Sequence, residues 1–568
     1  MSPTAPTAAP ERPVPEASPG PTAPVPTDSR SPASPAPVPK ASPSLAAAEP
    51  VPLVAPSLSP SAAPVPKASP ASLRAAVRAE APVLVPLAVL AFCTYAYFIG
   101  PPAWNQNSRL ALTRALVEQR TTIIDAYHIS TGDKSLRDGH FYSDKAPGAS
   151  LLALPGYALF YGVARVAGGD LPEVRVVPLY DSDQPEDDTA RKPGDRLSYN
   201  QPYRTALYLS RLLSTSLLAV AGVVALYLLA RRQLAREHAA VLTATYALAT
   251  PALVYSAALY GHQPCADLLL LGLAIPLLTE ETARPRLAAL ATGLCLGLAV
   301  VCEYPAAVPV VVLATLALVR RGPRFAAWLV VGGLPCAAVL AVYHLAAFGH
   351  PLKTGYDYVY LAEFAEGMRI RYGIHAPDPT VLLELLFGRF RGLFYLAPVL
   401  ILAAWGTVTQ ALARPADRTW PARQVAWASL AVIAFYLALN SGYYMWDGGA
   451  AVGPRHCVPM LPFLALGLAP ALRRVPRAVV ALALVSAAQM LAAAAAAPEA
   501  PQYGDPLWGH AWPHLLASRP GYGGATNLGL LLGLPGVLSV VPLLTLWWWT
   551  WSHLRGALKP SRSATVAS

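Results

Sequence analysis

Long apolar runs separated by short basic loops constrain the fold of this chain more than any other feature of its sequence. A membrane-crossing helix needs about 20 mainly apolar residues, and backbone groups in lipid must find their partners inside the segment. The runs therefore predict about twelve helical spans. They lie near residues 83–100, 205–230, 239–260, 264–278, 286–302, 305–319, 325–347, 393–413, 424–441, 458–471, 478–497 and 528–551.

The composition agrees with this interpretation. Of the 568 residues, 54% are hydrophobic and 13% are charged, whereas soluble domains have about 25% charged residues. The formal net charge of +11 comes from Arg and Lys clusters between apolar runs, which argues against a nucleic-acid partner. The sequence predicts an all-α, polytopic transmembrane helix bundle.

One further apolar run, 149–166, is shorter and is interrupted by Pro155. If it does not cross the membrane, every short basic loop falls on one side, as the positive-inside rule favours. We therefore expect a re-entrant or interfacial helix there, with both termini cytoplasmic. On this topology the long polar loops face the exterior, and they are 101–204, 348–392, 442–457 and 498–527.

Residues 1–75 are rich in Pro, Ala and Ser and have few large apolar side chains. Such a segment cannot bury enough surface to offset its conformational entropy, so we expect a disordered cytoplasmic tail. No apolar run precedes Val83, and no cleavable signal peptide is expected. The six cysteines lack metal-ligand spacing, and no metal site is assigned.

The stretch DGHFYSDKAPG, residues 138–148, concentrates ionisable groups just before an apolar run. Charges beside hydrocarbon are costly and usually mark function. Asp138 and Asp144 can accept a proton, and Lys145 can hold a phosphate. His140 and Tyr142 are candidates for binding the substrate. This inventory suits chemistry at a membrane surface.

The order of motifs over residues 83–300 resembles the front half of GT-C glycosyltransferases. An amphipathic helix at 107–120 in the first exterior loop is followed by DKAPG leading into LLALPGYALFYG, and then by Arg211 opening RLLSTSLLAV. The similarity is to the glycosyltransferase family 39-like group, which includes protein O-mannosyltransferases and lipid A aminoarabinose transferases. It implies a GT-C-like module at 83–347, followed by a second transmembrane module at 348–558.

The resemblance implies roles for two cations. In such enzymes the lysine of a K-P or K-P-P element helps to hold the phosphate of the lipid-linked donor. Lys145 matches it, with one residue inserted before Pro147. Arg109 matches an arginine that follows an acidic pair in the family, and it is implied to contact the same phosphate, while a helix-surface arginine that contacts lipid headgroups is the alternative.

The family's acidic pair is missing here. Its acid serves as the base that deprotonates the acceptor, but this chain has Gln106 and Asn107 at the matching positions, and an amide cannot accept a proton at neutral pH. Three explanations stay open. The base has moved to Asp125, Asp138 or Asp144, the amides only bind sugar hydroxyls, or the chain keeps the fold without transferase activity.

Later loops add further candidates. His262 stands where the family often has an acid before a proline, although a structural histidine is an equal alternative. Glu303, between two apolar runs, needs a partner or a polar cavity. In YYMWDGGAAVGPRHC, Trp446 and Asp447 suit sugar binding and Arg455 suits phosphate, while an interfacial aromatic belt is the alternative. Arg391 lies on the predicted exterior side, against the positive-inside trend, which either an anionic ligand or an acid in another loop would explain.

Taken together, the sequence predicts a membrane glycosyltransferase of the bacterial inner membrane. It would move a sugar from a polyprenyl-phosphate donor to a glycan, lipid or protein acceptor at the exterior face. Membrane lipids are the other expected partners, no cofactor is assigned, and dependence on a divalent metal is open. The alternatives are a non-catalytic or transport protein that binds lipid-linked sugars, and a scaffold recruited through the proline-rich tail.

Overall fold

The structure is a computed structural model that describes residues 73–177, 196–280, 282–413, 421–501, 503–517 and 524–558. All of these belong to the unit Val65–Ser568. Most of the predicted disordered tail, residues 1–72, lies outside the described residues, as does 178–195 within the first long loop.

The described part of the chain is mostly helical, as predicted, and it is that of a multi-pass membrane protein. Among the described residues, eight helical segments are long and apolar enough to cross a membrane. They are α1 (Leu73–Tyr97), α3 (Gly148–Ala167), α4 with α5 (Gln201–Arg211 and Leu217–Arg231), α9 (Pro285–Cys302), α10 (Ala307–Arg321) with the turn before it, α11 (Pro323–Phe348), α16 (Ala422–Ser441) and α19 (Pro476–Ala496).

The prediction of about twelve spans is therefore wrong for the described residues. They contain nine candidate spans only if the bent pair Arg455–Leu466 and Leu468–Arg474 counts as one span. The other apolar runs are helical but short or broken. A proline disfavours helical backbone in the residue before it, and Pro251 and Pro398 each separate two helices. The helices concerned are α6 (Arg236–Leu248), α7 (Ala252–Ser256), α8 (His262–Leu278), α14 (Leu393–Leu396), α15 (Val399–Leu412), α21 (Leu528–Leu531) and α22 (Val541–Leu558).

The run predicted as a re-entrant or interfacial helix forms α3, which is 20 residues long. Pro155 lies inside this helix without ending it. By length and composition α3 qualifies as a span, so its shortness no longer argues against crossing. Its start touches the end of α9, because a Cβ on Gly148 would lie 2.5 Å from the backbone nitrogen of Cys302.

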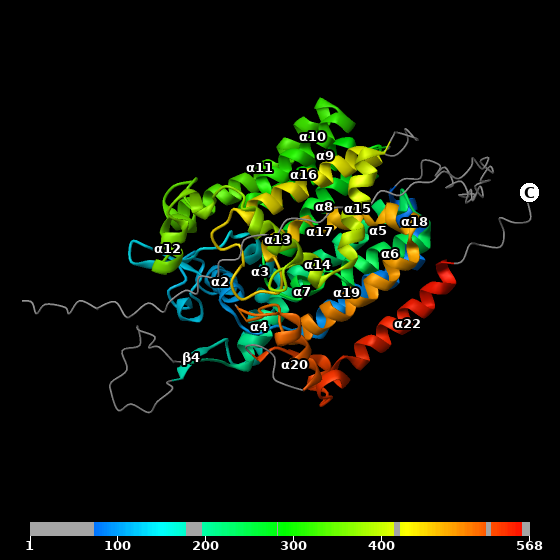
Figure 1. The fold of residues 1–568 in the computed structure, drawn as a ribbon. Helices are drawn as coiled ribbons and strands as arrows, with labels where there is room; N and C mark the ends of the chain where they lie inside the picture. The colour runs from blue at the N-terminus through cyan, green and yellow to red at the C-terminus, as the bar shows by residue number, and fades with distance from the viewer. Residues whose placement is uncertain are drawn as a thin grey trace, which may run out of the picture. The chain divides into compact units, whose positions relative to one another are not determined.

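The helices pack as a chain of neighbours. α11 lies along α9, α9 packs on α8, α8 on α5, α5 on α1, and α1 on α22. In Figure 1, α9, α10, α11 and α16 lie together, and the red helix α22 lies on the other side of the bundle. Small residues allow the closest of these approaches: a Cβ on Gly332 of α11 would lie 2.2 Å from the carbonyl oxygen of Leu290 of α9.

The segments between the spans carry short elements. Besides helices, the described residues contain three two-stranded antiparallel sheets. These pair β1 (Phe98–Ile99) with β6 (Thr526–Asn527), β2 (Lys134–Arg137) with β3 (His140–Ser143), and β4 (Val174–Val177) with β5 (Arg196–Tyr199). The short helices are α2 (Trp104–Arg114), α12 (Ala362–Met368), α13 (Pro379–Phe387), α17 (Leu461–Leu466), α18 (Leu468–Arg474) and α20 (Trp512–Leu516).

The amphipathic helix predicted in the first long loop exists as α2, but its surroundings differ from those of a surface-lying helix. All residues from Asn105 to Arg114 are buried. The helix packs against α3 and α4 and against the strand β3. It therefore lies beneath the hairpin strand β3 and contacts the helices α3 and α4 that follow the polar part of the first loop.

The contact between α9 and α11 can be tested with two neighbouring glycines. Gly332→Ala forces a methyl group against the backbone of α9, so we expect a loss of about 1–3 kcal/mol and a Tm several degrees lower in detergent. Gly333→Ala is the matched control, because its Cβ would lie 3.5 Å from the nearest atom, an ordinary contact. Equal Tm values for the two variants would contradict the close approach.

Candidate functional site

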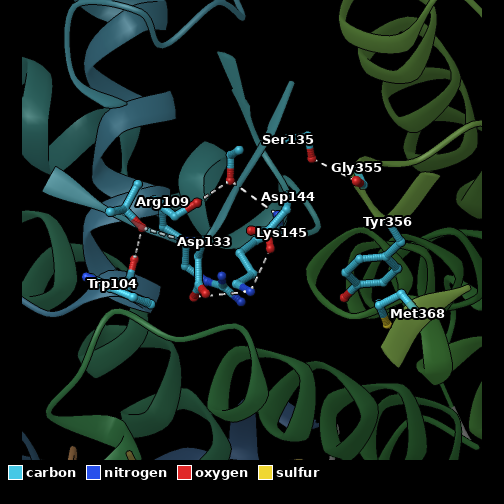
Figure 2. Close-up of polar contacts among 12 residues, drawn as sticks. Trp104, Arg109, Asp133, Ser135, Asp144, Lys145, Gly355, Tyr356 and Met368 are labelled. Atoms are coloured by element: carbon cyan, nitrogen blue, oxygen red, sulfur yellow. Dashed lines mark hydrogen bonds and ion pairs between the residues drawn. The ribbon is translucent and has the colours of Figure 1, made fainter. Parts of the chain in front are cut away.

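A β-hairpin in the first long loop brings two aspartates together. Asp133 precedes β2 and Asp144 follows β3, and the register pairs Lys134 with Ser143 at this end of the hairpin. The two carboxylates therefore lie opposite each other. The Nζ of Lys145 lies 3.1 Å from Oδ2 of each, and Figure 2 shows the lysine between them.

The surroundings of Lys145 favour its charged form. Burial works to lower the pKa of Lys145, but the carboxylates of Asp133 and Asp144 outweigh it and leave this pKa raised. Burial raises the pKa of Asp144, and the charge of Lys145 opposes that rise. The carboxylates thus keep a cation in place at a position largely shielded from water.

A second group of charges lies beside the first. Arg109 comes from α2, and its Nη2 lies 3.4 Å from Oε1 of Glu303. The same oxygen is 3.2 Å from Nδ1 of His262. Burial works to raise the pKa of Glu303, but His262, Arg109 and Lys145 outweigh it and lower this pKa. The partner predicted for the Glu303 carboxylate is therefore present.

Arg455 completes the set of cations. Its guanidinium lies over the ring of Tyr260, 5.8 Å from the centroid. Within the described part of the chain, no carboxylate lies at ion-pair distance from Arg455, and its buried Nε has no hydrogen-bond partner. The buried Nε and Nη1 of Arg109 likewise have none there. Guanidinium donors left over in this way suit a phosphate or carboxylate ligand.

Four of these residues stand at the ends of apolar helices, and Arg109, within α2, is in contact with Glu303. Lys145 lies three residues before α3, Glu303 separates α9 from the next span, and His262 opens α8. Arg455 opens the bent helix pair. Because Arg109, Glu303 and His262 are in contact and Gly148 touches Cys302, these helix ends lie at one level of the bundle. The cluster is therefore at one boundary of the apolar region.

Some predicted site residues lie elsewhere. Asp125 and His140 form an exposed pair, with His140 Nδ1 2.7 Å from Asp125 Oδ2. Asp138 occupies the hairpin turn with a φ of 52° and faces solvent beside Arg137. This turn is at the end of the hairpin opposite to Asp133 and Asp144. Of the three predicted bases, only Asp144 lies in the cluster.

Other predicted residues have structural contacts. Tyr142 packs in an apolar cluster that includes Phe348. Asn107 donates from Nδ2 to the carbonyl oxygen of Ser130 at 2.8 Å. The ring of Trp446 meets Phe390 edge-on, at 6.2 Å between centroids.

Arg391 serves the backbone rather than the cluster of cations and acids. Its guanidinium is fully buried and donates to the carbonyl oxygens of Asp447, Gly449 and Ala451. With its three nitrogens engaged, Arg391 holds the loop between α16 and Arg455 in shape. The predicted role of Arg391 in binding phosphate is therefore not proposed, because its donors are used by the backbone.

Sequence reasoning missed two carboxylates. Asp133 could have been found from Asp138-Gly139, a strong signal for a two-residue hairpin turn, because that turn pairs Lys134 with Ser143 and so sets Asp133 opposite Asp144 at the open end. Glu499, in the loop after α19, is 2% exposed. Its Oε1 accepts hydrogen bonds from Gln106 Nε2 at 3.0 Å and Tyr260 Oη at 2.9 Å. No local pattern marks Glu499, because its partners are far away in sequence.

Part of the loop after α11 also reaches the hairpin. Ser135 Oγ donates to the carbonyl oxygen of Gly355 at 2.7 Å. In Figure 2 the next residue, Tyr356, lies on the side of Lys145 away from Arg109. Among the described residues, no group of three or more His, Cys, Asp or Glu side chains is arranged to hold a metal ion.

No protein-family model and no curated protein matches this sequence. The chain is similar to the solved structures of ArnT from Cupriavidus metallidurans, in the apo state and bound to undecaprenyl phosphate. Each comparison has 16% identity over 74% of this chain, with TM-scores of 0.42 and 0.41. The chain spans 65% and 64% of the length of the two ArnT chains.

Two further similarities are to the arabinofuranosyltransferase AftD from Mycobacteria and to the archaeal oligosaccharyltransferase AglB from Archaeoglobus fulgidus. For AftD the identity is 16% and the TM-score 0.36, covering 73% of this chain and 26% of AftD. For AglB the values are 12% and 0.37, covering 74% and 56%. At identities and TM-scores this low, function must be argued from the residues of the site.

The role of Arg391 can be tested by Arg391→Lys. Lysine cannot donate to three separate carbonyl oxygens in one plane, so we expect a loss of about 2 kcal/mol, a lower Tm and faster proteolysis within residues 442–457. Arg389→Lys is the control, because Arg389 is exposed. A Tm and a proteolysis rate equal to those of the wild type in Arg391→Lys would contradict the assignment.

Proposed function

We propose that this protein transfers a sugar from a polyprenyl-phosphate donor to an acceptor at the exterior face of the membrane. The observation that carries the proposal is the cluster of three cations: Lys145 and Arg455 at the ends of apolar helices, and Arg109 from α2, which is bonded to Glu303 at another such end. A ligand whose tail lies in lipid and whose anionic group lies at the boundary meets both surroundings at once. The sequence resemblance to GT-C glycosyltransferases adds the reaction class.

The chemistry follows from the charges. The acceptor hydroxyl oxygen attacks the anomeric carbon, and the bond from that carbon to the phosphate oxygen breaks with inversion. The electron pair leaves with the lipid phosphate, whose negative charge grows during the step. Lys145, Arg109 and Arg455 stabilise that growing charge, and fixed cations in a site shielded from water do so most effectively. A carboxylate of the site takes the acceptor proton.

Asp133 and Asp144 hold the lysine for this role. An unpaired lysine at a buried site tends to lose its proton. The two carboxylates keep Lys145 charged and fix its Nζ between them.

The test uses the full-length protein in nanodiscs with a panel of radiolabelled polyprenyl-phosphate sugars. We expect Lys145→Ala to weaken donor binding and to lower transfer by about 100-fold or more, because a cation on the leaving phosphate is lost. Lys353→Ala is the matched control, since Lys353 is half exposed and pairs with Asp357 outside the cluster. Wild-type turnover in Lys145→Ala would remove this site.

The alternative is a carrier that only binds lipid-linked sugars. The buried donors of Arg109 and Arg455 serve binding as well as catalysis. The same assay separates the two functions. Donor binding that depends on Lys145, without transfer or hydrolysis by the wild type for any donor, would favour the carrier.

The two aspartates that the hairpin brings together beside Lys145 give a second prediction. Asp133→Asn removes one of the carboxylates that keep Lys145 charged, so we expect transfer to fall about 10-fold or more, at the scale of a lost charged hydrogen bond. Asp125→Asn changes an exposed aspartate of the same loop, and we expect transfer within about 2-fold of the wild type. The reverse order of effects would place the site at the hairpin turn instead.

A further inference from the structure

We infer that Glu499, from the loop after α19, is the carboxylate that accepts the proton of the acceptor hydroxyl. This inference rests on the proposed function and names a catalytic residue for it. It makes the chemistry depend on residues separated by almost four hundred positions in the chain.

Glu499 belongs to the same cluster as the cations. Tyr260 donates to its carboxylate and also lies beneath the guanidinium of Arg455. The next residue, Gly261, contacts Glu303 and Arg109. A Cβ on Gly261 would lie 2.2 Å from Glu303 Oε1 and 2.9 Å from Arg109 Nη2. Glu499 is thus linked to all of these groups through a single short segment.

The helix α2 makes a second link. Gln106, the other donor to Glu499, stands three residues before Arg109, and residues at this spacing are neighbours on a helix face. Gln106 is one of the two amides found where a carboxylate was expected. Its Oε1 accepts from the backbone nitrogen of Leu259, so the amide is held in one orientation with Nε2 toward Glu499.

The backbone around Glu499 is also held. α19 ends at Ala496, and Ala497 has a φ of 151°, which is rare for a residue with a side chain. The carbonyl oxygen of Pro498 accepts from the backbone nitrogen of Val452 at 2.9 Å. This bond ties the segment to the loop that leads to Arg455.

One oxygen of Glu499 is available. Oε1 accepts both hydrogen bonds, whereas Oε2 is buried and has no hydrogen-bond partner within the described residues. A buried carboxylate oxygen without a donor is costly. A hydroxyl of the acceptor, bound next to the cations, would supply that donor and present its proton to the carboxylate.

Glu499 also has the basicity that proton transfer needs. Burial raises the pKa of Glu499 to about 7, while Tyr260, Gln106 and Arg455 oppose the rise. Tyr255 also interacts with this carboxylate. A general base works best when its pKa lies near the working pH.

The contrast with Asp144 supports the choice. Burial raises the pKa of Asp144 too, and its Oδ1 is likewise buried without a partner, but its Oδ2 is bound to the ammonium of Lys145, which opposes that rise. The side chains that donate to Glu499 are an uncharged amide and a phenol, and among the described residues no cation lies at ion-pair distance from it. Asp144 then holds Lys145, and Glu499 takes the proton.

The step balances without any further reactant. The acceptor O–H bond breaks as the bond from oxygen to the anomeric carbon forms, and the proton moves to Oε2 of Glu499. The bond between the anomeric carbon and the donor phosphate breaks, and its electron pair stays with the phosphate. Glu499 later returns its proton to solvent or to the released lipid phosphate.

The main experiment compares Glu499→Gln with the wild type across pH 5–9, measuring kcat for transfer and the Kd for polyprenyl phosphate. Gln keeps an oxygen for both donors but cannot take a proton. We expect kcat to fall by about 100–1,000-fold, with the Kd changed by less than about 3-fold. Asp505→Asn, in the same loop and bonded to Tyr395, is the matched control and should leave kcat unchanged.

The pH profile adds a readout that a purely structural role would not change. The base must be ionised in the free enzyme, so wild-type kcat/KM, measured over the same pH range, should fall about tenfold per pH unit below about 7. Glu499→Gln should lose this dependence. Asp144→Asn holds Lys145 less firmly, so this variant should have a lower kcat but should retain the pH dependence of the wild type.

A charge exchange completes the test. In Gln106→Glu combined with Glu499→Gln, a carboxylate returns to the other side of a 3.0 Å hydrogen bond. We expect this double variant to recover at least about 10-fold in kcat over Glu499→Gln, a part of what a general base contributes.

The outcomes separate the two proposals. Wild-type kcat and an unchanged pH profile in Glu499→Gln, with donor binding still dependent on Lys145, would overturn the role of Glu499 alone. If Glu499→Gln does not fold, the wild-type profile decides, and a kcat/KM that stays flat down to pH 5 would overturn the role. A wild type that transfers no sugar would contradict the proposed function itself.

Discussion

Mutual neutralisation of buried charges is the constraint on which the site depends. Taking Lys145, Arg109 and Glu303 out of water costs several kcal/mol for each group unless an opposite charge lies within reach. The hairpin supplies two carboxylates for the lysine, and Glu303 serves Arg109 and His262 together. Because these partners come from different helices, pairing the charges also brings the helix ends to one level. The arrangement leaves guanidinium donors over, and in the proposed function these donors bind the phosphate of the sugar donor.

Much of the fold could be predicted from the sequence, because backbone groups in lipid must be hydrogen-bonded within their own segment and long apolar runs therefore form helices. Apolar runs became helices nearly everywhere they were expected. The count of spans failed where prolines such as Pro251 and Pro398 divide a run into pieces too short to cross. Hydropathy averages over a window and does not register where the backbone breaks. Hydropathy likewise does not show that Pro155 is accommodated within the continuous helix α3, and whether this helix is re-entrant, interfacial or spanning stays a prediction.

The site was only partly predictable, and the reasons differ from residue to residue. Lys145 and Asp144 stand out because they are charged and border an apolar run. Arg391 had the same appearance, yet its guanidinium is occupied by three carbonyl oxygens of a loop about 60 residues later. Asp133 required recognition of the hairpin, whose register sets it opposite Asp144. Glu499 required the three-dimensional fold itself, because no spacing rule joins it to Gln106.

The hairpin that carries Asp133, Asp144 and Lys145 is a local unit, whereas Arg455 and Glu499 come from the last quarter of the chain. During synthesis the lysine and its two acids can therefore associate as soon as the first long loop has left the ribosome. Gln106 and Tyr260, however, have no carboxylate acceptor until the segment after α19, which carries Glu499, has been synthesised. A chain stopped before that segment would leave Tyr260 and Gln106 without their common acceptor, between helices that are otherwise complete.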